Sequence, residues 1–249
     1  MSKLGTFVWH DLNTHDLDAA VAFYGKLFGW ELRSQGGWNL IINGERDQGT
    51  VMKLEASDPR PSHWLGYVTV ASVDEAAARA QRNGGKLCVG PMDIPNVGRF
   101  AIIQDPQGTP ISAFSYAGKP EDKPTEAPLG SVCWNELMTK DPAAAAAFYG
   151  EVFGWSTASM DMGPMGTYTL FKFAGQDVGG AMAMPPGEEH PPHWMHYFHV
   201  KDVDQSFAQA TALGATGMYP PNSIPGIGRM AALRDPTGAL FALFTPQVK

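Results

Sequence analysis

The chain has 249 residues, a formal net charge of −7 and a pI of about 5.4. The negative charge argues against a nucleic-acid partner, because a phosphate backbone is bound by a basic face. Apolar residues make up 44% of the chain, which is enough for two modest cores. No apolar run approaches the roughly 18 residues that span a bilayer, so we expect no membrane partner.

The first predicted elements are a strand, a helix and three more strands. Alternating β-forming residues predict a strand over Phe7–Leu12. Asp16 is a typical helix N-cap, and Gly29 follows the last apolar position of the predicted helix. Glycine and asparagine signals then separate three short strands, at Glu31–Ser34, Trp38–Ile42 and Thr50–Leu54.

The same order then begins again. A strand over Trp64–Val70 is followed by Ser72 and Glu75, which form a capping box at the start of a second helix. Asp105-Pro106-Gln107-Gly108 predicts a tight turn between the last two strands. Three strands complete this half, at Lys86–Val89, Phe100–Gln104 and Pro110–Ser115.

The whole arrangement is present twice. The stretch from Trp9 to Trp30 matches the stretch from Trp134 to Trp155 at an offset of 125, with 13 of 22 aligned residues identical. From His63 onward the offset is 130, which indicates a five-residue insertion around 161–166 or 185–192. A period this long exceeds that of repeat-array proteins and indicates two copies of a small domain.

A segment rich in proline and charge separates the two copies. We therefore predict a first domain over 1–117, an extended linker over 118–128 and a second domain over 129–249. The two cysteines, Cys88 and Cys133, do not match in the repeat, so a shared disulfide framework is not indicated. They fit a reducing compartment, and the first residues show no secretory segment, so we expect a cytoplasmic protein.

The Asp-x-x-x-Ala-x-x-Phe-Tyr-x-x-x-Phe-Gly-Trp helix and the Asp-Pro-x-Gly hairpin resemble the vicinal oxygen chelate superfamily, as does the order of elements. This superfamily contains glyoxalase I, bleomycin-resistance proteins, extradiol dioxygenases and fosfomycin-resistance enzymes. The resemblance implies an α+β fold of two tandem βαβββ-βαβββ domains, whose strands bend around a trough. It also implies a monomer that acts as an internal pseudo-dimer, or a homodimer.

Metal-dependent members hold their ion on the inward face of four strands. By this resemblance the first ligand position is Trp9 or Trp134, and the last is Ser112 or Ala242. Divalent metals prefer imidazole, thiolate and carboxylate ligands, so we expect no metal and no other cofactor. The middle positions align less closely and fall near 52–55 and 65–66, and near 180–184 and 195–196.

The favoured function is therefore metal-independent binding of a small molecule, for sequestration, sensing or resistance, in aromatic-lined cavities. The predicted ligand-binding residues are Trp9, Asp11, Ser112, Phe114, Trp134, Glu136, His196 and Phe244. The tryptophans either form the floor of a site or fill a core. The two acids could bind a hydrogen-bond donor or a cation of the ligand, or act as general bases. Alternatively, each acid bonds a nearby backbone group or arginine.

Two alternatives stay open at this point. The chain could be a metal-dependent glyoxalase-like lyase or an extradiol-type dioxygenase, with catalytic residues that the sequence does not assign. One copy could also bind a ligand while the other is a structural partner, since Gly66 pairs with His196 in the repeat. His193, His196 and His199 are three apart, so successive members face opposite sides of a strand and cannot share one ion.

Arg99 and Arg229 each follow a glycine in the loop before the penultimate strand of their copy. They could clamp an anion over the trough or form a salt bridge that fixes the loop. We favour the salt bridge, perhaps to the aspartate of the neighbouring Asp-Pro turn.

Overall fold

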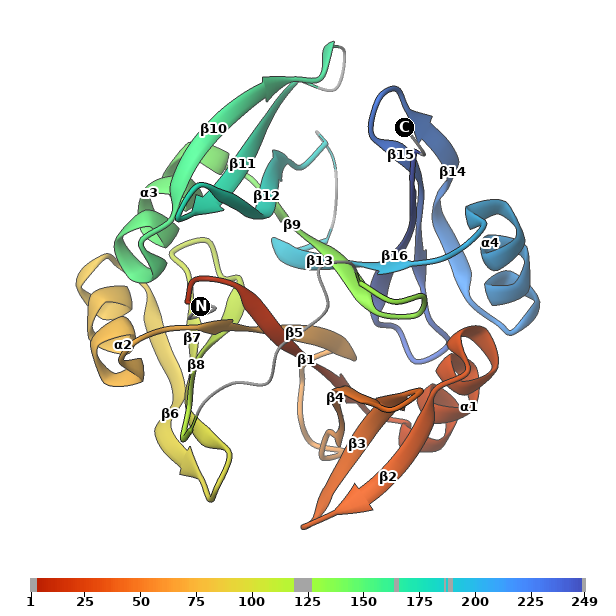
Figure 1. The fold of residues 1–249 in the computed structure, drawn as a ribbon, viewed down its shortest axis with the longest axis horizontal. Coiled ribbons are helices and arrows are strands. Elements are labelled where there is room, and N and C mark those ends of the chain that lie inside the picture. The colour runs from red at the N-terminus through yellow and green to blue at the C-terminus, as the bar shows by residue number, and fades with distance from the viewer. Residues whose placement is uncertain (1–3, 119–126, 164–165, 186, 188–189, 248–249) are drawn as a thin grey trace. The chain divides into compact units, whose positions relative to one another are not determined.

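The computed structural model describes residues 4–118, 127–163, 166–185, 187 and 190–247 (Figure 1). Most of the predicted linker, 118–128, lies outside the described residues. The first copy comprises β1 (Phe7–Thr14), α1 (Leu17–Phe28), β2 (Glu31–Gln35), β3 (Trp38–Asn43), β4 (Arg46–Lys53), β5 (His63–Thr69), α2 (Val73–Arg82), β6 (Lys86–Ile94), β7 (Gly98–Gln104) and β8 (Pro110–Tyr116).

The second copy repeats this order. It comprises β9 (Val132–Thr139), α3 (Pro142–Phe153), β10 (Ser156–Asp161), β11 (Thr167–Phe173), β12 (Gln176–Ala183), β13 (His193–His199), α4 (Val203–Ala212), β14 (Thr216–Ile224), β15 (Gly228–Arg234) and β16 (Leu240–Pro246). The strand order is β2-β3-β4-β1-β5-β8-β7-β6 in the first copy and β10-β11-β12-β9-β13-β16-β15-β14 in the second. The predicted fold, two tandem α+β domains of the βαβββ-βαβββ type, is confirmed.

The helix limits follow from the capping residues that the sequence predicts. The carboxylate of Asp16 accepts a hydrogen bond from the amide of Ala19 at 3.0 Å, and Asp141 caps α3 in the same way. Gly29 ends α1 with a left-handed φ of 75°, a conformation that glycine adopts without steric cost. Ser72 accepts from the amide of Glu75 at 3.2 Å, which confirms the predicted cap of α2.

Two strands extend beyond their predicted limits by four residues or more. Strand β4 begins at Arg46 instead of Thr50, and β6 runs to Ile94 instead of Val89. Both extensions contain exposed residues and register shifts, so the apolar alternation that marks a half-buried strand is lost there. The five-residue insertion of the second copy lies in the β10–β11 hairpin. The first residues of β2 and β10, Glu31 and Ser156, are 125 apart, whereas the last residues of β3 and β11, Asn43 and Phe173, are 130 apart.

Contacts divide the chain into two compact units, and each unit takes one half from each copy. Unit 1 contains α2 with β6–β8 and α3 with β10–β12, and unit 2 contains α1 with β2–β4 and α4 with β14–β16. The boundaries fall within the four central strands, for example between Trp9 and His10 in β1. The predicted limits 1–117 and 129–249 follow the sequence repeat and stay a prediction for independently folding domains.

A buried hydrogen-bond chain connects the two halves of unit 1. The indole of Trp194 donates to the phenolic oxygen of Tyr149 at 3.2 Å, and Tyr149 donates to the carboxylate of Asp105 at 3.0 Å. The second carboxylate oxygen of Asp105 accepts from the amides of Gln107 and Thr109 within its own turn. The repeated Asp-Pro-x-Gly turn of one copy is thus bonded to the Phe-Tyr helix of the other.

Unit 2 contains the same chain with the copies exchanged. Trp64 donates to Tyr24 at 3.1 Å, and Tyr24 donates to Asp235 at 2.9 Å. Around each tyrosine the helices and strands bury an aromatic and aliphatic core, in which Phe198 packs in unit 2 and Phe171 in unit 1. The sequence motifs that identify the fold are therefore the groups that bond inside these cores.

We predict that Tyr149→Phe and Tyr24→Phe each lower the free energy of unfolding by about 1–3 kcal/mol, because each leaves a buried carboxylate oxygen and an indole without their hydroxyl partner. Urea denaturation measures this, with Tyr219→Phe as the control, since Tyr219 is 45% exposed. Losses under about 0.5 kcal/mol in both variants, the range of ordinary surface changes, would contradict this role.

Because of these two tyrosines, we predict that the folded state loses stability at alkaline pH. Burial, followed by the charge of Asp235 or Asp105, raises the pKa of Tyr24 and Tyr149 well above 10. The folded state therefore holds the proton that the unfolded chain releases near pH 10, so this stability is present below about pH 10 and falls as the pH rises further. Between pH 9 and 11 the melting temperature of Tyr24→Phe should decline less steeply than that of the unsubstituted chain. Equal slopes in the two proteins would refute this prediction.

Candidate functional site

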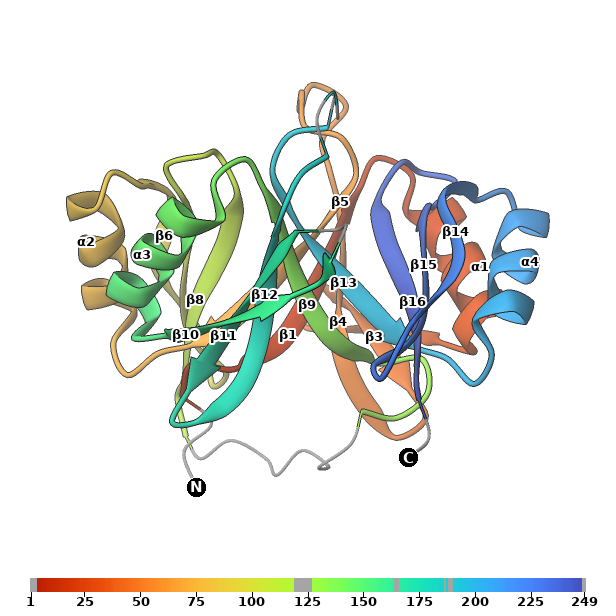
Figure 2. The same ribbon diagram turned by 90° about the horizontal axis from the view of Figure 1, so that it is seen from above.

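Within each unit, the helices cover one side of the strands and leave the other side without helices (Figures 1 and 2). The two largest cores include helix residues, whereas two smaller clusters consist of strand residues alone. These smaller clusters lie on the helix-free faces, where the sequence places the candidate ligand-binding residues.

In unit 1 the first copy presents an aromatic face. Its cluster combines Trp9, Tyr67, Phe100 and Phe114 with smaller aliphatic side chains. Register places Phe100 between Phe114 of β8 and Met92 of β6, and Met92 is exposed to solvent. Ser112 lies in β8 two residues from Phe114 and faces the same side, but it is fully buried. Its hydroxyl donates to the carbonyl of Ala101 at 3.2 Å.

The corresponding face of unit 2 belongs to the second copy. Trp134, Met195, Tyr197, Met230 and Phe244 form its cluster, together with small residues where the first copy has larger ones. Trp134 and Phe244 are half-buried.

Cys133 borders the cluster of unit 2. Its thiol lies 3.3 Å from the carbonyl oxygen of Tyr197. Burial raises the pKa of Cys133 to about 12, so the thiol stays protonated at neutral pH. Because the thiolate is the reactive form of cysteine, Cys133 is an apolar wall residue and no nucleophile.

The two predicted acids occupy matching strand positions in different surroundings. Asp11, in unit 2, is buried beside Thr50, and its carboxylate accepts hydrogen bonds from the Thr50 amide at 3.1 Å and from the Thr50 hydroxyl. This is the structural role that the sequence left open for an acid at this position. Glu136, in unit 1, lies beside Gly180 and is half-buried.

Glu136 belongs to a helix-free surface that we call the methionine face. It is formed in unit 1 by side chains of β9–β12 that register and alternation place on one side, namely Glu136, Met138, Met160, Tyr168, Leu170 and Met182. The phenol of Tyr168 occupies the space that a side chain at Gly180 would need. Tyr168 was not predicted as a residue of this face, although its spacing of two from Leu170 indicates that both side chains face the same side of the strand.

His196 is fully buried and lies apart from these faces. It is flanked along β13 by Met195 and Tyr197, which belong to the helix-free cluster, so its own side chain points to the opposite side of the strand. There its ring meets that of His10 at a centroid distance of 4.7 Å. A ligand-binding role for His196 stays a prediction.

Both candidate anion clamps are salt bridges. Arg99 contacts Asp74 in the first turn of α2 at 2.8 Å and Asp93 in β6 at 2.9 Å. The hydrogen bonds from Arg99 lower the pKa of the Asp74 carboxyl. Arg229 pairs with Asp204 of α4 in the same manner. The partners are carboxylates of the helices and, for Arg99, also of strand β6, and not the aspartates of the Asp-Pro turns.

The residues at the first and last metal-ligand positions that the resemblance predicts are poor ligands for a divalent ion. Trp9 and Trp134 offer an indole, Ala242 a methyl group, and Ser112 a hydroxyl that already donates to a carbonyl. Within the described part of the chain, no group of three or more histidine, cysteine, aspartate or glutamate side chains could hold a metal ion.

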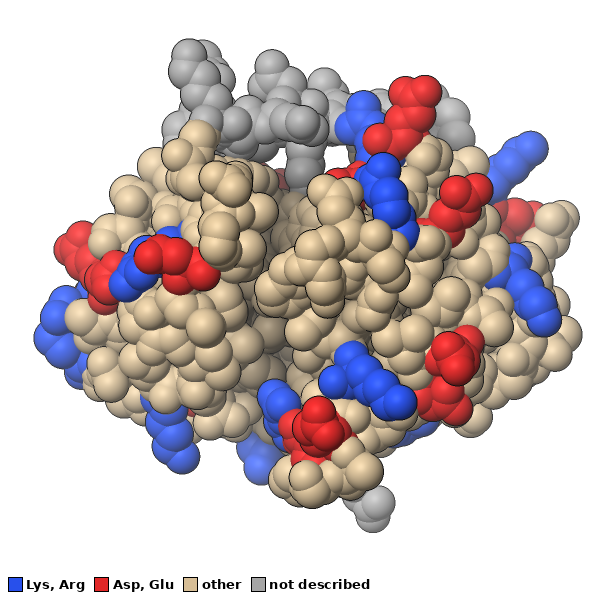
Figure 3. Space-filling model, turned by 90° about the horizontal axis from the view of Figure 1, so that it is seen from below, with Lys and Arg blue, Asp and Glu red and all other residues tan. Residues whose placement is uncertain are grey.

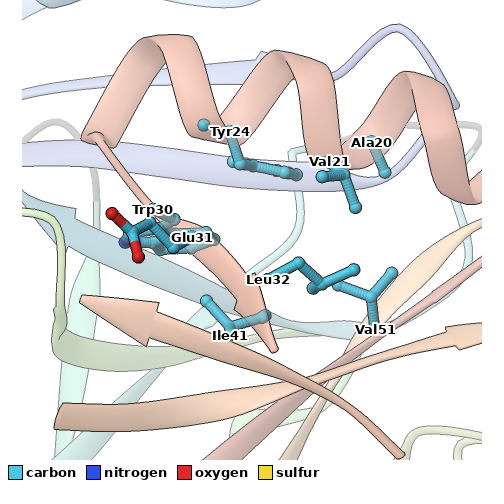
Figure 4. A pocket seen from close by; sticks show the side chains of 9 residues that line it. Ala20, Val21, Tyr24, Trp30, Glu31, Leu32, Ile41 and Val51 are labelled. Atoms are coloured by element: carbon cyan, nitrogen blue, oxygen red, sulfur yellow. The ribbon is translucent and has the colours of Figure 1, made fainter. Parts of the chain in front are cut away.

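A shallow pocket lies on the helix-covered side, between α1 and β2–β4 (Figure 4). Its walls are core residues such as Tyr24, Trp30 and Ile41, so it is a packing crevice away from the helix-free faces. Figure 3 shows a surface on which charged side chains are scattered among uncharged ones, in keeping with a charged content of 17%. None of the described helices combines the length and apolarity needed to cross a bilayer.

The family model that describes the Glyoxalase/Bleomycin resistance protein/Dioxygenase superfamily matches residues 4–112 and 131–243 of this sequence. The chain belongs to this superfamily. Among curated proteins it is 35% identical to CFP32 of Mycobacterium tuberculosis, whose name marks it provisionally as a glyoxylase, over 98% of this chain and 96% of that protein. It is 29% identical to the anthracycline biosynthesis protein DauV of Streptomyces sp. strain C5, over 96% and 92%.

Solved structures of the superfamily share the fold. The Mn(II)-bound glyoxalase from Novosphingobium aromaticivorans has a TM-score of 0.66 at 16% identity, over 98% of this chain and 83% of that chain. The 2,2′,3-trihydroxybiphenyl 1,2-dioxygenase from Sphingomonas wittichii strain RW1 has a TM-score of 0.66 at 15% identity, over 99% and 92%. At these identities the likeness concerns the fold alone.

We predict that Asp11→Asn and Thr50→Val each cost about 1–2 kcal/mol of unfolding free energy, because each removes part of the buried bond between the carboxylate and Thr50. The double variant should cost less than the two single losses combined, since the second change finds the bond already broken. Urea denaturation of all four proteins measures the coupling. Strictly additive losses would show that the pair does not act as a unit.

Proposed function

We propose that this protein binds small apolar or aromatic molecules without a metal ion, for sequestration, sensing or resistance. The observation that carries the proposal is the composition of the helix-free faces. At the first and last ligand positions that the resemblance predicts for metal-binding members, this chain has tryptophan, alanine and a serine bonded to its own backbone. An indole beside other aromatic rings suits a flat carbon-rich ligand better than a cation shell.

Two further observations support an aromatic ligand. Val89 and Met92 are 39% and 47% exposed beside the aromatic face, so apolar surface is accessible there. Exposed apolar surface of this kind often marks a ligand-binding groove. The relatives DauV and DnrV are named for anthracycline biosynthesis, and anthracyclines contain a polycyclic aromatic quinone.

The test combines metal analysis with ligand binding. Purified protein should carry only substoichiometric Zn, Ni, Fe or Mn after dialysis, and anthraquinone-2-sulfonate should raise its melting temperature by mass action. A stoichiometric metal that resists dialysis would favour the alternative, a metal-dependent glyoxalase-like lyase or extradiol-type dioxygenase.

Trp9→Ala and Trp134→Ala should each reduce the thermal shift, and the double variant should abolish it, because each removes the indole of one face. Ile227→Ala, in the exposed turn between β14 and β15, is the matched control and should keep the full shift. A full shift in the double variant would show that the ligand lies elsewhere.

A further inference from the structure

One row of side chains differs in height between the helix-free faces of the two units. Each row crosses four neighbouring strands, and partners on adjacent strands point to the same face of a sheet. In unit 1 the row consists, from β6 to β5, of Val89, Ile102, Ser112 and Tyr67. In unit 2 the matching row consists, from β14 to β13, of Tyr219, Ala232, Ala242 and Tyr197. The middle of the second row is therefore lower than its two ends.

The two alanines, Ala232 and Ala242, form what we call the alanine floor of unit 2. Each contributes a single methyl group, whereas Ile102 of the first copy has three more side-chain carbons than Ala232. Because neighbouring strands are about 4.8 Å apart, the strands that carry Tyr219 and Tyr197 are roughly 14 Å apart along the sheet. The floor is thus two strands wide and has an aromatic side chain at each end.

The alanine floor is bordered by exposed and adaptable side chains. Tyr219 is 45% exposed and its partner Ala232 is 8% exposed, so solvent reaches the floor from the edge at β14. Met195 and Met230 belong to the same apolar cluster as the alanines. Methionine has three rotatable bonds and fits irregular shapes, so these side chains can move aside when a ring system binds.

The same place in unit 1 is filled by stiffer side chains. The rings of Phe100 and Phe114 pack against Tyr67 at centroid distances of 6.3 and 6.4 Å. Ile102 belongs to the same cluster and stands in the middle of the row, where its branched side chain has few alternative conformations. A broad flat molecule therefore finds a raised centre in unit 1 and a low centre in unit 2.

We propose that the helix-free face of unit 2 binds flat compounds of four fused aromatic rings, which the face of unit 1 excludes, and that residue 232 sets this size limit. The ring system lies on Ala232 and Ala242, and Tyr219 contacts its outer edge. In unit 1 the side chain of Ile102 occupies the corresponding space. The proposal rests on the proposed function, since it requires helix-free faces that admit aromatic ligands.

The experiment compares two ligands of different breadth and equal charge. Pyrene-1-sulfonate has four fused rings and naphthalene-2-sulfonate has two, and each carries one sulfonate, so the net charge of −7 disfavours both alike. Isothermal titration of the full chain should give one site per chain for pyrene-1-sulfonate and two for naphthalene-2-sulfonate. Two equivalent sites for pyrene-1-sulfonate would overturn the proposal.

Exchanging the residues at 102 and 232 tests which side chain sets the limit. Ala232→Ile should weaken pyrene-1-sulfonate binding at least about tenfold, because the added carbons occupy the floor, and should leave naphthalene-2-sulfonate binding unchanged. Ile102→Ala should raise the number of pyrene-1-sulfonate sites from one to two. Ala208→Ile makes the same addition at an exposed position of α4 and should change the binding of neither ligand.

Binding of naphthalene-2-sulfonate at two sites shows that a variant is folded. If Ala232→Ile does not fold, Ile102→Ala decides the question, because the proposal requires it to gain a site. Unchanged affinity for pyrene-1-sulfonate in folded Ala232→Ile, or a single site in Ile102→Ala, would overturn the proposal.

Failure of this proposal is distinguishable from failure of the proposed function. If naphthalene-2-sulfonate and anthraquinone-2-sulfonate bind while pyrene-1-sulfonate binds no site or two sites, the size limit is wrong and the proposed function stands. If none of the three compounds binds, the proposed function itself fails, and the size limit fails with it.

Discussion

The hydrogen-bond chain from tryptophan through tyrosine to aspartate is the interaction on which each compact unit depends. It joins Trp194 and Tyr149 of the second copy to Asp105 of the first, and its counterpart in unit 2 runs the other way. A buried carboxylate is tolerated because the turn amides and the phenol satisfy its oxygens. Neither copy therefore completes its own core, which explains why the compact units cut across the sequence repeat.

These bonds lie in the helix-covered cores and leave the helix-free faces free to differ between the copies. Ile102 of the first copy corresponds to Ala232 of the second, and Thr50 corresponds to Gly180. Each pair occupies the same place in the sheet, so the backbone is unchanged while the shape and polarity of the surface change. One scaffold thereby presents several distinct surfaces, and function resides in these surfaces and not in the fold.

The sequence predicts the fold well because its signals are local and repeated. Caps such as Asp16 and Ser72 and the alternation of the strands are read from neighbouring residues, and the structure confirms them. The partners of the motif residues were not predicted, since Tyr149 and Asp105 lie 44 positions apart and no local pattern links them. The site was predicted only in part for the same reason, because the contact between Tyr168 and Gly180 depends on how β11 pairs with β12.

The central claim is that the helix-free faces hold an organic molecule where relatives hold a metal. A crystal structure of the chain with anthraquinone-2-sulfonate, recorded with anomalous data at transition-metal edges, tests this most directly. The account predicts the ring system in contact with Trp9 or Trp134 and no anomalous peak on either face. A metal ion bound by three or more of the chain's own side chains on a helix-free face would contradict it.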